Sequence, residues 1–258
     1  MIIRHRHTWS HGCDCCCCDL FDPSYQTVLD YGTLQGYTLP SEEQQLLQNQ
    51  HVIELKGAGI WDKLDIYYVF ATDGDRNFAK INWKSPAAHY MSEFNSITFT
   101  ANQGFTGNGS NMYLSTNFNP TVSGVNYLLN NASRYMYARL AGTGIFYDGT
   151  LGDTSTRLRI GNTANNSING GGDTFNTAGN NSMKSIHRTS SNTTVFFNNI
   201  TQTNGVAVST SRPNDSQTVL RSTANYANCQ LSNYAMGASL VAENTAFVNS
   251  FNTYVTSI

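Results

Sequence analysis

The side chains best suited to hold a metal ion lie together near the N-terminus. The segment HRHTWSHGCDCCCC combines histidines with a run of cysteines, and Cys and His are the ligands that zinc prefers. His11, Cys13 and Cys16 are the strongest candidates within it. The spacing does not match the usual cysteine pairs separated by a loop, so zinc binding is the weaker of two interpretations. The favoured one is an arm whose thiols stay reduced or bridge between subunits. The clustered thiols are those of Cys13, Cys15, Cys16, Cys17 and Cys18.

The second chemistry to consider is glycoside hydrolysis, which usually needs two carboxyl groups. The acids after residue 100 are Asp148, Asp153, Asp173, Asp215 and Glu243. They form no clustered motif, and Asp148 and Asp153 flank a glycine-rich segment, FYDGTLGD, where turn geometry explains them. The same region holds a lone histidine, His187, and no G-x-S-x-G nucleophile elbow. These observations predict a protein that is not an enzyme.

The third chemistry is sugar recognition, which needs aromatic rings beside planar polar groups. Tyr147, Asp148 and Asn162 offer these types in and near FYDGTLGD, and Tyr226 and Tyr234 offer them further along the chain. Aromatic residues in strands more often belong to the core. Exposed tyrosines gathered at a loop rim would therefore favour binding, and tyrosines buried between sheets would favour a purely structural role.

Three helical segments are expected, two before the candidate sugar-binding residues and one at the C-terminus. Ser41 as N-cap and Gln44 three residues later form a capping box, and Gly57 is a C-terminal stop, which predicts a helix over residues 41–56. Its apolar stripe would consist of Leu46, Leu47 and Ile53. A second short helical run is expected from Ile60 to Ala71. Apolar residues at three- and four-residue steps predict a C-terminal helix over about residues 240–257, with Ser239 as the nearest cap.

From about residue 94 the pattern becomes that of short strands. Ile97 and Phe99 alternate with polar residues, and similar pairs recur at Leu158, Val195 and Val206, separated by Gly and Asn punctuation. Short alternating runs of this kind are typical of a sandwich or jelly roll. We also expect Trp61 and Trp83 to pack between the helical segment and the sandwich.

Composition excludes several classes of protein. Charged residues make up 12% of the 258 residues, about half the usual share, and the net charge is −2. A nucleic-acid binder would need a basic face. No stretch approaches the roughly 18 apolar residues of a membrane span, and the N-terminus lacks the apolar core of a signal peptide. A lone Cys229 in the large domain favours a reducing compartment.

Two long blocks carry a resemblance to a known family. GAGIWDKLDIYYVFATDGDRNFAKINW, which runs into FNSITFTANQGFTGNGSNMYLSTNFNP, and the ending YAMGASLVAENTAFVNSFNTYVTSI resemble structural proteins of tailed bacteriophages. The resemblance covers residues 41–258 and keeps the order of both motifs. Val241 departs from it, because the family usually has a polar helix cap there. The cysteine-rich arm matches nothing in the family.

The resemblance implies a concanavalin A-like (laminin G-like) jelly roll in a virion component, such as a head fibre, a capsid decoration or a tail-associated protein. Residues 1–39 would then be an anchoring arm with Trp9 and the cysteines at the contact, residues 40–93 a helical connector, and residues 94–258 the jelly roll with its helix. The expected partners are capsid, portal or tail proteins and further copies of the chain, with no nucleic acid or membrane. Assembly would take place in the bacterial cytoplasm. The alternative function is a lectin-like adhesin module that contacts host carbohydrate.

Overall fold

The computed structural model describes residues 21–140, 142, 146–153, 155–161 and 164–258. Trp9, His11, the five clustered cysteines and Asn162 lie outside these ranges. The predictions of an anchoring arm, a zinc site and a sugar contact at Asn162 therefore stay predictions. Cys229 is a buried free thiol whose pKa is raised by burial.

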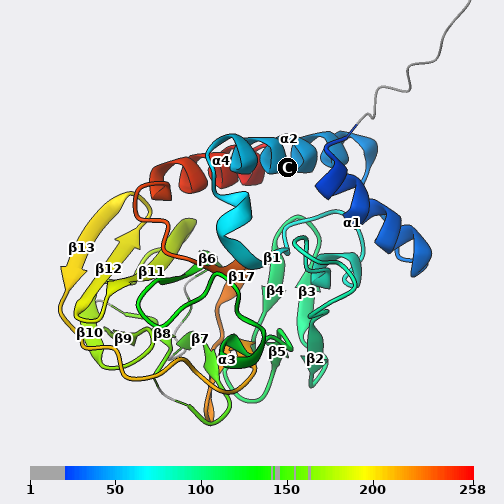
Figure 1. Ribbon diagram of the computed structural model, residues 1–258. Helices are drawn as coiled ribbons and strands as arrows, with labels where there is room; N and C mark the ends of the chain where they lie inside the picture. Colours follow the sequence, from blue (N-terminus) through cyan, green and yellow to red (C-terminus); the bar gives the residue numbers. More distant parts are fainter. Residues whose placement is uncertain (1–20, 141, 143–145, 154, 162–163) are drawn as a thin grey trace, which may run out of the picture.

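The molecule has three layers: helices cover one face of a large antiparallel sheet, and a smaller sheet covers the other face (Figure 1). The helices are α1 (Pro23–Leu34), α2 (Glu42–Gly57), α3 (Pro120–Ser123) and α4 (Asn244–Thr256), with short 3-10 turns η1 (Trp61–Lys63) and η2 (Phe78–Lys80).

The large sheet has the order β13–β12–β11–β6–β17–β4–β3, and β1 also pairs with β17. Their bounds are β1 Leu64–Val69, β3 Thr98–Thr100, β4 Gly104–Thr106, β6 Ala132–Leu140, β11 Ser182–Ser190, β12 Thr193–Asn198, β13 Thr201–Gly205 and β17 Gln230–Gly237. The smaller sheet has the order β2–β5–β14–β7–β8, with β2 Ser92–Phe94, β5 Tyr113–Ser115, β7 Phe146–Thr150, β8 Leu158–Arg159 and β14 Gln217–Val219. Two separate pairs join β9 (Ala164–Ser167) to β10 (Gly172–Phe175), and β15 (Arg221–Ser222) to β16 (Asn225–Tyr226).

The mainly β sandwich with antiparallel sheets agrees with the prediction, while the jelly-roll topology remains a prediction. Trp61 and Trp83 lie, as predicted, in the apolar core between the helices and the large sheet. The expected two-residue pattern at Val206 and Val208 does not form a strand. β13 ends at Gly205, and both valines are exposed.

The helical prediction for Ile60–Ala71 is wrong, because this segment contains η1 followed by strand β1. Ile66 and Tyr68 pack into the core between the two sheets, whereas Tyr67 and Val69 pack under the helices. A strand buried on both faces has apolar residues at consecutive positions, so its sequence does not alternate. The segment expected to be a purely helical connector therefore contributes a strand to the large sheet.

Helix α2 forms where predicted, but of its expected apolar stripe only Leu47 packs against the core. Ser41 caps it by accepting a hydrogen bond from the backbone N of Gln44. Leu46 and Ile53 are 52% and 44% exposed. The inward face carries the buried Val52 and Leu55 together with polar side chains that hydrogen-bond across the interface. Gln48 Nε2 donates to the hydroxyl of Tyr254 on α4 at 2.9 Å.

Residues 21–39 belong to the folded body, which corrects the expectation of an arm with little periodicity. The Asp22 carboxylate accepts from the backbone N of Ser24, and Pro23 occupies the first turn, which starts α1. The hydroxyl of Tyr25 donates to Gln48 Oε1 of α2 at 2.7 Å. The buried positions, Tyr25, Val28, Leu29 and Gly32, have the spacing of one helix face.

The C-terminal helix is confirmed, but it begins later than expected. α4 starts at Asn244 rather than near residue 240, and the residue before it, Glu243, makes no side-chain cap hydrogen bond. Leu240 is buried in the core beneath the helices instead of opening the helix. Val241, where the phage family usually has a polar cap, therefore lies before the start of α4.

Histidine 187 is held in one neutral form beneath α4. Its Nδ1 accepts from the backbone N of Leu240 at 3.2 Å. Its Nε2 therefore carries the proton and donates to Ser185 Oγ at 3.0 Å, and that hydroxyl donates to Asn244 Oδ1. A second proton on the ring would face the Leu240 N–H. Burial lowers the pKa of His187 to about 3.

Histidine 51 is buried in the same way between α2 and α4. Its ring nitrogens lie 2.7 Å from Ser250 Oγ and 2.5 Å from the Tyr67 hydroxyl. Ser250 Oγ also donates to Glu54 Oε2. Burial lowers the pKa of His51 to about 3 as well.

These two histidines predict a loss of stability in mild acid. Their pKa is about 6.5 in an unfolded chain and about 3 in the folded one. The unfolded state therefore binds more protons between these values. Stability should be complete above pH 6.5 and should fall below it by about 1.4 kcal/mol per pH unit for each histidine. Urea unfolding between pH 7.5 and 5 measures this slope.

A matched pair of variants separates the histidines from other groups. His187→Gln should remove about half of the slope and His51→Gln the other half, because burial lowers both pKa values to about 3. An equal slope in the wild type and His187→Gln would show that His187 is not responsible.

Candidate functional site

Three of the residues proposed for sugar binding lie inside the protein. Tyr147 and Asp148 belong to β7 and Tyr234 to β17, and none of them has exposed surface. The first half of FYDGTLGD is thus a strand and not a turn. The Tyr147 hydroxyl donates to the Thr177 carbonyl at 3.1 Å. By the criterion of exposure set above, these three side chains serve the structure.

Asp148 forms a buried ion pair with Arg134, and this pair joins the two sheets. Arg134 lies on β6 of the large sheet, and both side chains are fully buried. Asp148 also accepts from the backbone N of Leu158 at 3.0 Å and from the Tyr234 hydroxyl at 2.9 Å. Burial raises the pKa of Tyr234 to about 12, so its hydroxyl remains a donor at neutral pH.

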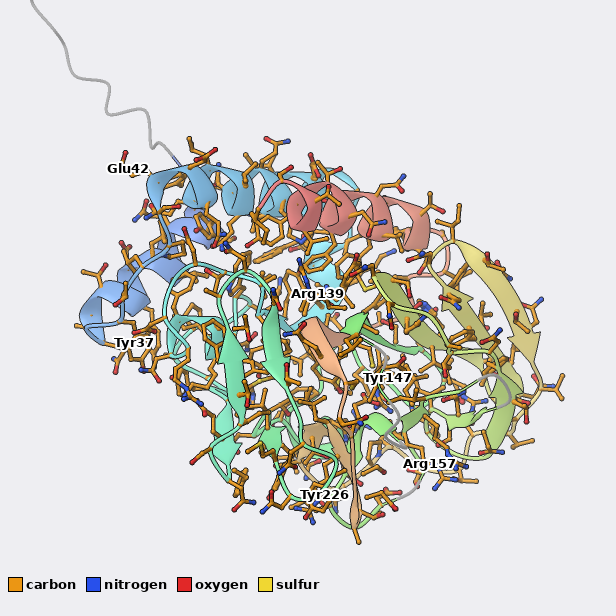
Figure 2. All side chains as sticks on the ribbon, turned by 180° about the vertical axis from the view of Figure 1, so that it is seen from behind. Tyr37, Glu42, Arg139, Tyr147, Arg157 and Tyr226 are labelled. Atoms are coloured by element: carbon orange, nitrogen blue, oxygen red, sulfur yellow. The ribbon has the colours of Figure 1, made fainter. Side chains whose placement is uncertain are left out.

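Tyr226 alone among the described candidates reaches the surface. It lies at the end of the sandwich opposite the helices (Figure 2). There it meets Tyr113 and Arg221, and Tyr113 in turn packs on Phe94. The Phe94 and Tyr113 rings are stacked, with centroids 4.3 Å apart and planes 4° from parallel. The Tyr113 and Tyr226 centroids are 6.0 Å apart. We call these four residues the aromatic platform.

The platform faces outward because of the strand register. Phe94 on β2 is paired with Tyr113 on β5. The next residue, Leu114, packs into the core between the sheets, so Tyr113 points to the opposite face of its strand. Phe94 is 38% exposed. Tyr113 is 7% exposed although it belongs to neither apolar core, so its platform neighbours cover it.

Arg221 lies against two of the rings. Its Cζ is 4.5 Å from the Tyr113 centroid and 5.0 Å from the Tyr226 centroid, within the range of cation–π attraction. Its Nε donates to the Thr223 carbonyl at 2.6 Å. The guanidinium is therefore held in place by a backbone group on one side and by aromatic rings on the other.

The hairpin that carries Arg221 and Tyr226 is fixed onto β7. The backbone N of Leu220 donates to the Tyr147 carbonyl at 2.7 Å, and that of Thr223 donates to the Thr150 carbonyl at 2.6 Å. Between these bonds the hairpin lies directly against Gly149. A Cβ there would be 2.3 Å from Ser222 Oγ. The absence of a side chain at Gly149 lets the hairpin approach the strand.

The remaining carboxylates bind groups of the fold. Asp173 accepts from the backbone N of Ala207 at 3.0 Å, Asp153 from Ser155 and Asp215 from Gly152. Glu243 pairs with Lys63. Among the described residues no group of three or more His, Cys, Asp or Glu side chains is placed to hold a metal ion. None of the helices in that part of the chain has the length and hydropathy of a membrane span.

The sequence interpretation missed three of the four platform residues. Phe94 and Tyr113 sit in strands of three residues, which are too short to show which side chains point outward. Only Phe94 carried a weak signal of an exposed position, because it directly precedes the turn residues Asn95 and Ser96. Nothing in the sequence distinguishes Arg221.

Comparison with solved structures shows the β-sandwich fold. The receptor binding domain of botulinum neurotoxin C/D mosaic serotype has a TM-score of 0.51 and 8% identity, over 74% of this chain and 52% of that one. Trypanosoma rangeli sialidase in complex with 2,3-difluoro-KDN has a TM-score of 0.52 and 7% identity, over 81% and 40%. The chain thus spans about half or less of these two proteins.

A third structure, domain 4 of a GH43 extracellular arabinanase from Geobacillus stearothermophilus in complex with arabinotriose, has a TM-score of 0.46 and 9% identity, over 72% of this chain and 98% of that one. No family model matches the chain, and no curated protein matches it. Neither the neurotoxin domain nor the sialidase is a virion protein, so the phage resemblance gains no support from these two structures.

The buried ion pair predicts a large loss of stability when one partner is removed. Arg134→Met leaves the Asp148 carboxylate buried without its counter-charge and should cost about 3–5 kcal/mol. Arg76→Met, at the partly exposed pair with Glu93, should cost about 1 kcal/mol or less. Urea unfolding at pH 7 compares the two. Similar costs for both variants would contradict a special role for the Arg134–Asp148 pair.

The close approach at Gly149 predicts that a single methyl group displaces the hairpin. Gly149→Ala should cost about 1–3 kcal/mol and should shift the ring NMR signals of Tyr113 and Tyr226. Gly152→Ala is the control, because the nearest atom to its added Cβ would be 3.8 Å away. Unchanged ring signals in Gly149→Ala would show that the platform does not depend on this contact.

Proposed function

We propose that the chain is a non-enzymatic carbohydrate-binding module and that the aromatic platform is its sugar contact. The observation that carries this proposal is the grouping of Phe94, Tyr113, Tyr226 and Arg221 on one outer surface. The rings of Phe94 and Tyr226 are partly exposed, and such rings flanked by a polar group suit the apolar face and hydroxyl edge of a sugar.

The platform is rigid before any ligand binds, which supports the proposal. Phe94 and Tyr113 are fixed by a strand pair, and Arg221 and Tyr226 by a two-stranded hairpin bonded to β7. Side chains that are already ordered lose little conformational entropy on binding. The surface can therefore hold a small ligand with few contacts.

The fold gives further, coarser support. Of the two structures described above that have a TM-score above 0.5, the sialidase is in complex with a sugar derivative. This chain matches 40% of that sialidase, and the likeness is one of fold alone. The residues of the platform are this chain's own.

Attachment to a tailed-phage particle stays a prediction from the sequence resemblance. Residues 21–39 pack on α2 through Tyr25 and through the ion pair between Asp22 and Lys56. An anchoring segment would therefore consist of residues 1–20. Such an anchor at one end and a sugar contact opposite the helices at the other are compatible within one adhesin.

The test is binding to an array of neutral and acidic glycans, followed by titration of the best ligand. Tyr226→Ala and Phe94→Ala should each weaken binding about tenfold or more, which is about 1.4 kcal/mol. Tyr37→Ala is the matched control, because Tyr37 is a partly exposed tyrosine that packs on Tyr90, far from Tyr226 in Figure 2. Equal binding by all three variants, or no glycan bound, would overturn the proposal.

A further inference from the structure

We propose that the aromatic platform selects sugars that carry a carboxylate and that Arg221 is the residue that determines this specificity. The inference rests on the proposed function, since it names the class of ligand for the same surface. It follows from the charge, the geometry and the backbone conformation around Arg221.

The charge of Arg221 is not neutralised within the described part of the chain. No carboxylate there lies within 4.0 Å of its guanidinium. Other basic side chains of the protein are paired: Lys56 with Asp22, and Arg76 with Glu93. A cation without a counter-charge, set among aromatic rings on a partly exposed surface, is suited to an anionic group from outside.

The geometry leaves the terminal nitrogens of Arg221 for a ligand. Its Nε is occupied by the Thr223 carbonyl, and the guanidinium rests on the rings of Tyr113 and Tyr226. No other hydrogen bond of this side chain occurs within the described residues. A guanidinium held in this way presents a planar edge that matches the two oxygens of a carboxylate. The neighbouring rings can contact the sugar that bears it.

The backbone on both sides of Arg221 is in a conformation that side chains rarely adopt. Leu220 has φ of 67° and Thr223 has φ of 53°, and after Phe94 the values are 60° at Asn95 and 54° at Ser96. Left-handed conformations at bulky or β-branched residues are strained and concentrate at ligand-binding sites. Here Leu220 and Thr223 lie on either side of Arg221 and are held by hydrogen bonds to β7, and the other two residues directly follow Phe94.

The test uses pairs of sugars that differ in charge alone. Trigalacturonic acid is compared with its methyl ester, and 3′-sialyllactose with its methyl ester, by calorimetric titration of the full chain. We expect the wild type to bind at least one free acid about tenfold more tightly than its ester, a difference of about 1.4 kcal/mol. The preference should fall as salt is raised, because the contact is ionic and partly exposed.

Variants assign the preference to Arg221. Arg221→Gln should bind acid and ester equally, and Arg221→Lys should keep part of the preference, since it retains the charge and loses the planar edge. Arg139→Gln is the control, because Arg139 is likewise partly buried and lies well away from Tyr226 in Figure 2. It should behave as the wild type. Circular dichroism checks that each variant is folded.

The outcomes separate this inference from the proposed function. Equal binding of acids and esters by the wild type, with loss of both in Tyr226→Ala, would overturn the acidic specificity and leave the sugar contact intact. A preference for acids that survives in Arg221→Gln would overturn the role of Arg221. Absence of binding to every glycan would overturn both proposals.

Discussion

A pair of opposite charges removed from water sets the arrangement of the sandwich. Arg134 and Asp148 come from different sheets and have no exposed surface, so neither can lose its partner without a large penalty. Their contact fixes where β7 lies under the large sheet. The carbonyls of Tyr147 and Thr150, on either side of Asp148, then hold the β15–β16 hairpin. The position of Arg221 and Tyr226 on the surface therefore depends on a charge pair in the interior.

The helix layer adds a set of buried polar contacts to its apolar core. The inward face of α2 carries Gln48 and His51, whose side chains bond to Tyr25, Tyr254 and Ser250. Buried polar groups are tolerated only when they are hydrogen-bonded, and each of these bonds requires a particular placement of its partner. The three helices are thus fixed to one another in one orientation, which apolar packing alone specifies less strictly.

The sequence was informative where a feature is local and silent where it is set by distant contacts. The capping box at Ser41 and the periodicity of the C-terminal helix predicted α2 and α4. The strand at Leu64–Val69 was mistaken for a helix, because burial between two layers removes the alternation that identifies a strand. The platform could not be foreseen, because Phe94, Tyr113 and Arg221 meet through the pairing of short strands far apart in the chain. Tyr147, Asp148 and Tyr234 had suitable chemistry for a site, and only the structure shows that this chemistry joins the sheets.

The place of β17 in the large sheet has a consequence for synthesis of the protein. This strand lies between β6 on one side and β1 and β4 on the other, yet it is the last strand along the chain. A chain still leaving the ribosome already has β1, β4 and β6 but lacks β17, the strand that joins them. The edges of β6 and β1 remain open until residues 230–237 emerge, and open edges invite pairing with other chains. The sandwich can therefore close only after residues 230–237 have emerged, and chains shortened before β17 should aggregate rather than form a smaller domain.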